Sequence, residues 1–457
     1  MSETQLRVLS LNCWGLKYVA KNRPERIAAI ARALASSSHD IVALQEIWVS
    51  ADYALVRNSV ASRLPYAKYF YSGALGAGLA IFSRFPIIAA TIHPYSLNGS
   101  PIDVTAGDWF VGKAAASVLI SHPLLGQVQV FNTHLFAKGG EEGPDYNRAH
   151  RLVNAWEFAK LARQSAELGR YVIAAGDFNS VPNTLPMNII RDHAGLSDAW
   201  QVSHPALHTS STPPSPSGAI SAFGVTADSP LNSYSSGKPL EGMARRFGGK
   251  RLDYIFFRQP TKPPASDKTP ILTCTNSNVM FTDRVPGQEF SFSDHFGLEA
   301  TFEIRFPAED VESVYHAEPT MPTAGAQSRG SIAISSTSNI SSSVPSSLTA
   351  ESIVPILQSL TACYRYSKSR ARMHLTIFAS CIVLLLGLII SSAWLPRSWF
   401  SPIFVFAAVV VAWLATTMLY VGFVYGRWEV NALMNVIEEL EIMRGGIGTR
   451  YDSRSDR

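Results

Sequence analysis

Two uncharged apolar runs near the C-terminus restrict most strongly what this chain can fold into. Residues 375–394 and 402–426 contain no charged side chain, and only the short segment 395–401 separates them. An apolar helix of about 20 residues is long enough to cross a hydrocarbon layer about 30 Å thick. Because the connector is too short to recross a bilayer, the sequence predicts an antiparallel transmembrane hairpin. A helical hairpin buried in a soluble domain is the alternative.

Basic residues flank this hairpin on one side. The connector contains only Arg397, so the positive-inside rule predicts that both chain termini and the large N-terminal part are cytosolic. We therefore expect an integral, two-pass membrane protein of the endoplasmic reticulum, another endomembrane or a mitochondrial membrane. The N-terminus lacks a basic segment followed by an apolar one, so no signal peptide is expected. The flanking basic residues are Arg365, Lys368, Arg370, Arg372 and Arg427.

Charge and cysteine content exclude two classes of protein. Lys and Arg number 39 against 35 Asp and Glu, and the net charge of +4 is too small for a surface that binds duplex nucleic acid. We therefore expect no nucleic-acid partner. The cysteines show no C-x-x-C spacing, which argues against a zinc site or a disulfide framework and fits a reducing compartment. They are Cys13, Cys274, Cys363 and Cys381.

Polar side chains follow several short apolar segments that are typical of buried strands. Asn12, Glu46 and His134 each stand at the end of such a segment. Singly, each has a plainer explanation, since Asn often caps turns, Glu is often solvated and His is often packed. Their repetition at strand ends predicts a shared cleft, in which a carboxylate such as that of Glu46 suits a hard cation like magnesium.

The apolar segment 171–175 leads into the most informative pair. Asp177 and Asn179 are two residues apart on extended backbone, so their side chains point the same way while Phe178 points into the core. Asp can accept a proton or orient water, and Asn can donate to a phosphate oxygen without adding negative charge. This pairing favours phosphoester cleavage, and an ordinary β-turn is the alternative.

Two acidic residues and an imidazole follow later in the chain. Asp253 lies near the start of the predicted strand 250–257, and Asp294 and His295 stand together before the predicted closing strand 298–304. Carboxylates beside an imidazole suit metal or proton chemistry, although Ser-Asp-His alone is weakly specific.

Residues 107–113 match the pattern G-x-x-x-x-G-K of a nucleotide-binding loop. That loop requires Ser or Thr at the next position, where this chain has Ala114, and it must open a helix. The following segment 114–120 predicts a strand instead, so nucleotide binding is excluded. Asp108 and Lys113 are then expected to form a local ion pair.

In this order, six short motifs resemble those of the endonuclease/exonuclease/phosphatase superfamily. The resemblance spans residues 1–306 and is specific for the superfamily. It implies a deoxyribonuclease I-like fold, an α/β (α+β) four-layer sandwich, here followed by the C-terminal two-helix transmembrane hairpin. The motifs are Leu11-Asn12, Gln45-Glu46, Asn132-Thr133-His134, Gly176 to Asn179, Arg251 to Tyr254 and Ser293-Asp294-His295.

The chain then divides into segments by composition and resemblance. Within the first domain, residues 203–246 are rich in Ser, Pro and Gly and predict a long loop. The predicted segments are a catalytic domain at 1–306, a Ser-rich disordered linker at 307–350, a basic juxtamembrane segment at 351–374, transmembrane helices at 375–394 and 402–426, and a cytosolic tail at 427–457.

Two segments and the hairpin are similar to neutral sphingomyelinases and fungal inositol phosphosphingolipid phospholipases C. The segments are 107–113 and 224–231. The resemblance implies magnesium-dependent hydrolysis of a membrane sphingolipid, inositol phosphosphingolipid or sphingomyelin, to ceramide and a phosphorylated headgroup. It also implies activation by anionic phospholipid, and it leaves protein partners open.

The resemblance further implies roles for the metal and water residues. Glu46 is expected to be the principal Mg²⁺ ligand, with Asn12 beside it and Asp294 close to the metal. His295 is expected to activate or orient the attacking water, and Asp253 to fix the tautomer of His295. The number of metal ions stays open.

The remaining roles concern the phosphate and its control. Asp177 is expected to orient the nucleophile and Asn179 to stabilise the pentacoordinate phosphate, while His134 binds the phosphate or helps to protonate the ceramide alkoxide. Which histidine is the general base stays open. Asp108 and Lys113 resemble a pair thought to switch the site on; a plain surface ion pair is the alternative.

Three alternatives to the phospholipase are considered. A nuclease of the same fold is disfavoured by the small net charge and the membrane hairpin. An inositol-phosphate phosphatase is disfavoured by the sphingomyelinase-like segments. A membrane-tethered scaffold with an inactive site is disfavoured because every expected site residue is present.

Overall fold

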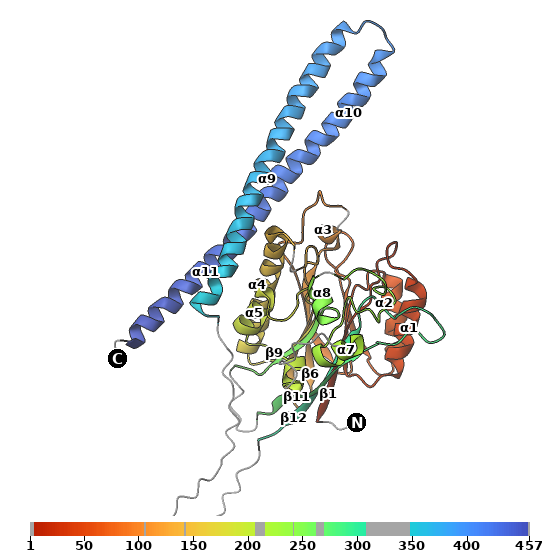
Figure 1. Cartoon of the computed structure of the whole chain (residues 1–457), viewed down its shortest axis with the longest axis vertical. Helices are drawn as coiled ribbons and strands as arrows, with labels where there is room; N and C mark the ends of the chain where they lie inside the picture. The colour runs from red at the N-terminus through yellow and green to blue at the C-terminus, as the bar shows by residue number, and fades with distance from the viewer. Residues whose placement is uncertain are drawn as a thin grey trace, which may run out of the picture.

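Figure 1 shows a domain of two stacked sheets with a long pair of helices projecting from its side. This computed structural model describes residues 4–104, 107–140, 143–205, 215–240, 242–261, 269–307 and 348–455. Nearly all of the predicted linker 307–350 lies outside these residues.

Each sheet has six strands. The first sheet has the order β11 (Ile271–Met280), β12 (Gly297–Arg305), β1 (Gln5–Asn12), β2 (Ile41–Gln45), β4 (Leu79–Ser83), β3 (Tyr66–Phe70). The second has the order β5 (Ile87–Pro94), β6 (Ala114–His122), β7 (Gly126–His134), β8 (Tyr171–Asp177), β10 (Asp253–Arg258), β9 (Ser197–Asp198).

Alternation of side chains along the strands builds the layers. In β1, Leu6 and Val8 lie in the core between the sheets, whereas Leu9 and Leu11 face helix α1 (Arg23–Ser36). Helix α2 (Ser50–Val60) also packs on this outer side, and α4 (Asp145–Glu167) covers the outer side of the second sheet. The predicted four-layer sandwich is therefore confirmed.

Two parallel strand pairs create the edge on which the site is built. β1 runs parallel to β2 with Asn12 opposite Gln45, and β7 runs parallel to β8 with His134 opposite Asp177. The carboxyl ends of parallel neighbours meet at one edge of a sheet. Residues far apart in sequence are brought together there.

Short helices complete the second half of the domain. The predicted long loop 203–246 contains α7 (Pro216–Phe223) and the start of α8 (Gly242–Phe247), and its residues 206–214 and 241 lie outside the described part. Ser215 caps α7 by accepting a hydrogen bond from the amide of Gly218. The remaining short helices are α3 (Asp108–Val111), α5 (Leu185–Asn188), η1 (Ile189–His193) and α6 (Ala199–Ser203).

Two helical arms form the hairpin. The first is α9 (Ala350–Ser391), which ends in η3 (Ser392–Trp394). The second consists of α10 (Phe400–Leu419), η4 (Tyr420–Tyr425) and α11 (Gly426–Ser455). Both arms contain a stretch long and apolar enough to span a membrane, and the apolar side chains there are largely exposed.

The N-terminal part of α9 and helix α11 pack on the two-sheet domain. One buried hydrophobic cluster joins three helices. It contains Ala155 of α4, Ile356 and Leu360 of α9, and Leu433 and Leu440 of α11. Helix α4 is therefore apolar on two faces, because one face covers the sheet and the other receives the hairpin. The juxtamembrane segment 351–374 and the tail 427–457 are predicted from the sequence as separate segments. In the fold, residues of both belong to one hydrophobic core with the domain.

A buried ionic cluster closes this junction. Glu429 of α11 accepts hydrogen bonds from Arg370 of α9 (2.6 Å) and lies 2.9 Å from Nε2 of His150 on α4. Nδ1 of His150 in turn accepts a hydrogen bond from the amide of Gly99 (3.0 Å). These residues, Arg370, His150, Glu429 and Gly99, are called the junction cluster below.

Candidate active site

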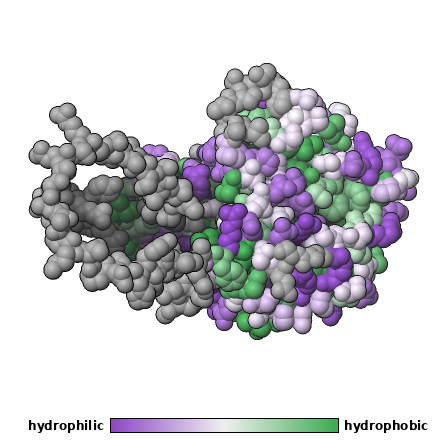
Figure 2. All heavy atoms as spheres, turned by 90° about the horizontal axis from the view of Figure 1, so that it is seen from below, coloured by the Kyte–Doolittle hydropathy of each residue, from purple (hydrophilic) through white to green (hydrophobic). Residues whose placement is uncertain are grey.

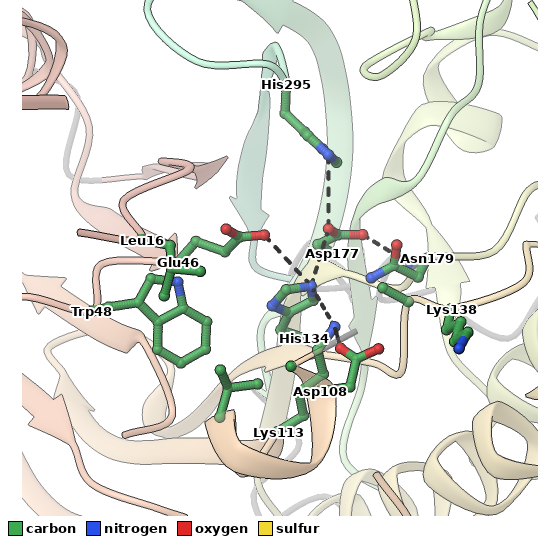
Figure 3. Close-up of a pocket in the computed structure, with 13 residues that line it drawn as sticks. Leu16, Glu46, Trp48, Asp108, Lys113, His134, Lys138, Asp177, Asn179 and His295 are labelled. Carbon is green, nitrogen blue, oxygen red and sulfur yellow. Dashed lines mark hydrogen bonds and ion pairs between the residues drawn. The ribbon is translucent and has the colours of Figure 1, made fainter. Parts of the chain in front are cut away.

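An open cleft of about 540 Å³ lies where the carboxyl ends of the two parallel strand pairs meet. Figure 3 shows Glu46, His134, Asp177 and His295 pointing into it from both sheets. All ten candidate site residues line this cleft or lie directly behind it. The lining includes Glu46, Asp108, Lys113, His134, Asp177, Asn179 and His295, and behind it lie Asn12, Asp253 and Asp294.

The backbone is strained where it presents these groups. Glu46 has φ +54° and Asn179 has φ +47°, a left-handed conformation that side chains with a Cβ rarely adopt. Gly176 has φ +152°, and a Cβ at that position would stand 2.2 Å from the carbonyl oxygen of Thr133. The close packing of β7 on β8 therefore requires glycine directly before Asp177.

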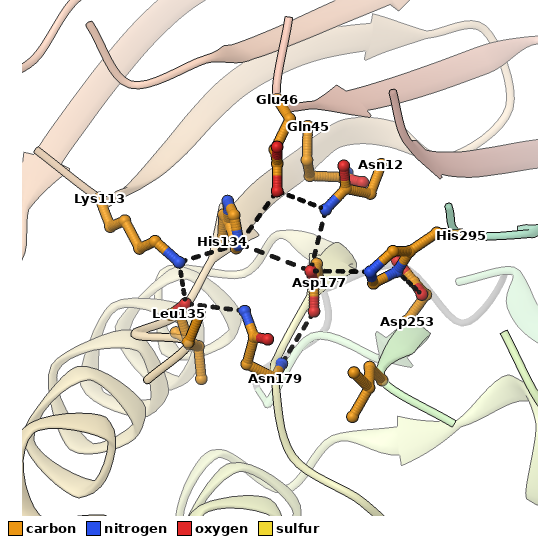
Figure 4. A network of polar contacts seen from close by, with 12 residues as sticks. Asn12, Gln45, Glu46, Lys113, His134, Leu135, Asp177, Asn179, Asp253 and His295 are labelled. Atoms are coloured by element: carbon orange, nitrogen blue, oxygen red, sulfur yellow. Dashed lines mark hydrogen bonds and ion pairs between the residues drawn. The ribbon is translucent and has the colours of Figure 1, made fainter. Parts of the chain in front are cut away.

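Asn12 joins the two sheets at the floor of the cleft. Its Nδ2 group donates to Oε1 of Glu46 (3.1 Å) and to Oδ2 of Asp177 (3.0 Å), as Figure 4 shows. Asp177 also accepts a hydrogen bond from the amide of Asn179 (2.9 Å), and Nδ2 of Asn179 donates to the carbonyl of Leu135 (3.0 Å). One amide thus holds carboxylates from strands β2 and β8 side by side.

His295 lies between two carboxylates. Its Nδ1 is 2.9 Å from Oδ2 of Asp253, and its Nε2 is 4.0 Å from Oδ2 of Asp177. Because a carboxylate accepts hydrogen bonds, Asp253 fixes the tautomer with the proton on Nδ1. Burial favours neutral His295, but Asp253 and Asp177 outweigh it and raise the pKa of His295 well above its usual value.

Lys113 occupies the opposite wall. Its Nζ lies 3.0 Å from Oδ1 of Asp108, 3.0 Å from Nε2 of His134 and 2.9 Å from the carbonyl of Leu135. The Asp108–Lys113 ion pair expected from sequence is therefore buried and touches a site histidine. Burial, together with the charge of Lys113, lowers the pKa of His134 well below its usual value.

Three acidic groups of the site are short of positive charge. Burial raises the pKa of Glu46, Asp177 and Asp294, and the nearby charge of Asp294 raises that of Glu46 further. A carboxylate whose pKa is raised in this way gains from a cation placed beside it. The carboxylate oxygens of Glu46 and Asp294 are the type of ligand that Mg²⁺ prefers, so the acidic residues present fit a divalent cation. Asn12, also expected beside the metal, directs its Nδ2 to Glu46 and its Oδ1 to the amide of Trp14 (3.0 Å), so it positions Glu46 and offers no free oxygen.

A second group of ligand-type atoms lies in the same cleft. Asp177, Asp253 and His295 each offer one such atom, all within 4.8 Å of one another. Asp253 and His295, however, already satisfy each other through Nδ1. This arrangement is that of a histidine with its orienting carboxylate, and it leaves the region of Glu46 as the better cation site.

Sequence reasoning missed the residues that hold this site together. Oγ1 of Thr226 accepts hydrogen bonds from the amides of Leu252 and Asp253, while its carbonyl accepts from the amide of Phe296. Nδ2 of Asn232 donates to the carbonyl of Ser293 (2.9 Å). The segment 224–231, noticed only for its resemblance, therefore braces the strands and loops that carry Asp253 and His295.

Two further buried links were also missed. Gln45 of β2 donates to Oδ1 of Asn132 on β7 (2.7 Å), which joins the two sheets beneath the site. The guanidinium of Arg26 donates to the carbonyls of Cys13, Trp14 and Phe292, and so ties together the loops on either side of Glu46. The sequence indicates the Gln45–Asn132 link only in that both amides stand within site motifs. It contains no signal for the contacts of Arg26.

Comparison with known proteins identifies the fold and its chemistry. Residues 9–295 match the endonuclease/exonuclease/phosphatase family. The chain belongs to this family. The endonuclease/exonuclease/phosphatase domain thus covers the whole cleft, from the strand before Asn12 to His295.

Two named relatives narrow the comparison. The chain is 35% identical over 448 residues to "Inositol phosphosphingolipids phospholipase C" of Schizosaccharomyces pombe, which covers 96% of this chain and 94% of that relative. It is 32% identical over 302 residues to "Sphingomyelin phosphodiesterase 2" of Homo sapiens, which covers 66% of this chain and 65% of the human protein.

A solved structure is also similar. The crystal structure of SmcL aligns with a TM-score of 0.47 and 19% identity, over 65% of this chain and 99% of that one. Family membership and the two curated relatives make the chain a phosphodiester hydrolase.

Proposed function

We propose that the chain is a magnesium-dependent phospholipase C that hydrolyses sphingolipid phosphodiesters to ceramide and a phosphorylated headgroup. The observation that carries the proposal is the match, along nearly the whole chain, to a relative named inositol phosphosphingolipids phospholipase C. The cleft supports it, because buried carboxylates whose pKa is raised lie beside two histidines whose pKa is shifted in opposite directions.

Glu46 and Asp294 would hold the magnesium ion, with Asn12 beside them to position Glu46. A bound divalent cation would neutralise charge on the phosphate and on the leaving oxygen. Glu46 is positioned for this by its strained backbone and by the hydrogen bond from Asn12. Asn12 also donates to Asp177, so the cation residues and the water residue share one hydrogen-bonded group.

Asp177 and Nε2 of His295 flank the point at which water would attack phosphorus. Water adds to the phosphorus, its proton passes to the carboxylate of Asp177, and the bond from phosphorus to the ceramide oxygen breaks. That oxygen takes up one proton, so the products are ceramide and the phosphorylated headgroup. Asp253 keeps Nε2 of His295 toward Asp177 throughout, because it occupies Nδ1.

Asn179, His134 and Lys113 are proposed to bind the phosphate. Lys113 has only donors, so Nε2 of His134 accepts from it, and the His134 proton lies on Nδ1. The lowered pKa of His134 favours a hydrogen-bonding role over that of an acid that protonates ceramide. Asp108 holds Lys113 in place, and breaking this pair is proposed as the step that switches the site.

The relatives favour an inositol-type headgroup. The Schizosaccharomyces pombe protein matches across the hairpin as well as the catalytic domain, whereas the human sphingomyelin phosphodiesterase matches over 66% of the chain. We therefore propose inositol phosphosphingolipids as the main substrate and sphingomyelin as the second.

The hairpin is proposed to hold the enzyme in the membrane that contains its substrate. Both flanks of the hairpin pack on the same domain, which supports a two-pass topology with both termini on one side. The basic flanks place that side in the cytosol and suit anionic phospholipid as an activator. The membrane is one of the endomembranes or a mitochondrial membrane.

One assay tests this function. Full-length protein in mixed micelles is given inositol phosphosphingolipid, sphingomyelin, duplex DNA and a phosphoinositide in parallel, each with Mg²⁺ or with a chelator. We expect ceramide release that requires Mg²⁺, fastest with the inositol lipid. DNA nicking or release of inorganic phosphate in place of ceramide would move the chain to another activity of the same fold. His295→Ala is the inactive control.

A further inference from the structure

Three loops form the rim of the cleft and carry exposed apolar side chains. The first loop contains Tyr18 and Val19, the second Tyr71 and Leu75, and the third Ile102 and Val104. Their exposed fractions range from 46% for Ile102 to 89% for Tyr18. Large apolar side chains this exposed, gathered around one opening, are typical of a surface that meets a partner.

Contacts with the cleft show that the loops belong to its rim. Leu16, next to the first loop, lines the cleft, and so does Lys138, which forms an ion pair with Asp103 of the third loop. The amides of Ala74 and Leu75 in the second loop both donate to the carbonyl of Phe110 (3.0 Å) in α3. The second and third loops therefore form one wall of the opening.

The hairpin fixes which way this rim faces. Nε1 of Trp428 donates to the carbonyl of Ser96 (2.9 Å), and the hydroxyl of Tyr425 donates to the carbonyl of Gly99. Trp and Tyr at the end of an apolar helix mark the level of the membrane surface. Here they hold the segment that leads directly into Ile102.

Figure 1 shows the same geometry. The loop before α3 is the part of the domain that reaches furthest along the hairpin toward its exposed apolar stretch. Seen from below, in Figure 2, the described surface of the domain mixes hydrophilic and hydrophobic residues. The hairpin therefore brings one end of the domain, and the cleft in it, to the membrane.

We propose that the rim loops at Tyr18, Tyr71 and Ile102 lie in the surface of the bilayer that the hairpin spans, so that the cleft opens directly onto lipid. Lys17, whose Nζ lies 5.2 Å from the ring centre of Tyr18, adds a positive charge at the level of the headgroups. This proposal rests on the proposed function for its substrate. A sphingolipid then enters with its headgroup first and keeps its acyl chains in the membrane.

Single cysteines test the contact without any need for activity. The native cysteines are all buried, so an added exposed cysteine is labelled selectively. Full-length Tyr18→Cys, Tyr71→Cys and Ile102→Cys are labelled with an environment-sensitive dye and reconstituted into vesicles of neutral and anionic phospholipid. Ile271→Cys is the matched control, since Ile271 is 52% exposed at the start of β11, far from the rim.

The rim dyes are expected to shift to the blue and to be quenched by lipids that carry a nitroxide near the headgroup, while the dye at Ile271 stays aqueous. Rim dyes that behave like the Ile271 dye would overturn the proposal. A blue shift without quenching by the nitroxide lipids would also overturn it, because it would show a contact with protein instead of lipid.

Activity provides a second, separate arm. Ile102→Asp combined with Val104→Asp is expected to slow hydrolysis of substrate in bilayers about tenfold, because charged side chains are costly in the apolar region. Hydrolysis of a short-chain substrate in free solution is expected to stay near that of wild type, and Ile271→Asp to behave as wild type on both. Equal losses on both substrates would overturn the lipid contact. If the rim dyes lie in the bilayer but the wild-type protein does not hydrolyse the sphingolipid, only the proposed function is refuted.

Discussion

Buried carboxylates lie both in the junction cluster and in the cleft, and the two places differ in how the charge of the carboxylates is balanced. At the junction, burial opposes charged Glu429, yet His150 and Arg370 outweigh it and lower the pKa of Glu429 to about 2. In the cleft, burial raises the pKa of Glu46, Asp177 and Asp294, and the cations nearby do not compensate. The same chemistry is satisfied in one place and unsatisfied in the other.

This difference separates a structural cluster from a functional one. A buried carboxylate with its cations in place stabilises the packing of the hairpin on α4. Carboxylates held together without enough positive charge cost stability, and a site retains them because a cation and a phosphate will complete them. Glu46 belongs to the cleft and Glu429 to the junction cluster, so each glutamate can be replaced while the other place is observed.

Removal of a cleft carboxylate gives the largest expected effect. Asp177→Asn is expected to lower turnover by a factor on the order of 10² to 10⁴, because the group that receives the proton of water is lost. The melting temperature is expected to stay the same or rise, since a costly buried charge has gone. The control is Glu303→Gln, which removes a half-exposed carboxylate on β12. A large fall in stability would show that the cleft cluster is structural.

The junction should show the reverse pattern. Glu429→Gln leaves the half-buried Arg370 without its anion, and we expect a loss of about 3 kcal/mol in the free energy of unfolding. Hydrogen exchange should rise in α4 and α11, and ceramide release in micelles should persist below the melting temperature. Glu439→Gln, which breaks a half-exposed ion pair with Lys160, is the control and should cost less than about 1 kcal/mol. A Glu429→Gln protein as inactive as Asp177→Asn would break the distinction.

Magnesium should stabilise through one cluster only. At a Mg²⁺ concentration 100 times its dissociation constant, we expect about 2.7 kcal/mol of added stability in wild type. Thermal unfolding with and without chelator should show this increment in Glu429→Gln but not in Glu46→Gln. If Glu46→Gln keeps the full increment, the cation is held elsewhere, for instance at Asp177 and Asp253.

The contributions of Glu429 and Glu46 to the free energy of unfolding should change with pH in opposite directions. This is the smallest of the expected effects. The lowered pKa of Glu429 stabilises the fold above its usual value of 4.5, and this stability is lost as the pH falls toward 2. The raised pKa of Glu46 destabilises metal-free protein near neutral pH, and this cost disappears as the pH falls to 4.5. Each proton changes the free energy of unfolding by at most about 1.4 kcal/mol per pH unit.

Chemical denaturation from pH 7 to pH 3 measures both effects in protein without metal. The stability gap between wild type and Glu429→Gln should begin to narrow only below pH 4.5, whereas the gap between wild type and Glu46→Gln should narrow on the way from neutral pH to 4.5. Gaps that close in the same range would contradict the assignment of the two clusters.

The site residues at strand ends could be predicted from the sequence, because a general rule of sheet geometry places them together. Asn12, His134 and Asp177 end strands of the two parallel pairs, and parallel strands deliver their carboxyl ends to one edge whatever else the chain does. Phe178 points into the core as expected, because side chains alternate along extended backbone.

The bracing residues followed no such rule. Thr226 contacts residues 252, 253 and 296, and Gln45 meets Asn132 from 87 positions away. The junction depends on longer separations still, since His150 and Glu429 are 279 positions apart. Glu429 lies in the segment 427–457, which the sequence predicts only as a cytosolic tail.

The sequence by itself therefore determined the elements with local causes: the alternating strands, the apolar helical arms and the polar residues that end the strands. Tertiary structure alone decided which charges are compensated. Glu46 and Glu429 are both single glutamates beside apolar segments, and a sequence gives no distance between a carboxylate and a cation hundreds of residues away. Coulomb energy depends on that distance and on burial. Only the folded chain therefore makes Glu429 a stabilising partner of Arg370 and His150, and Glu46 a candidate metal ligand.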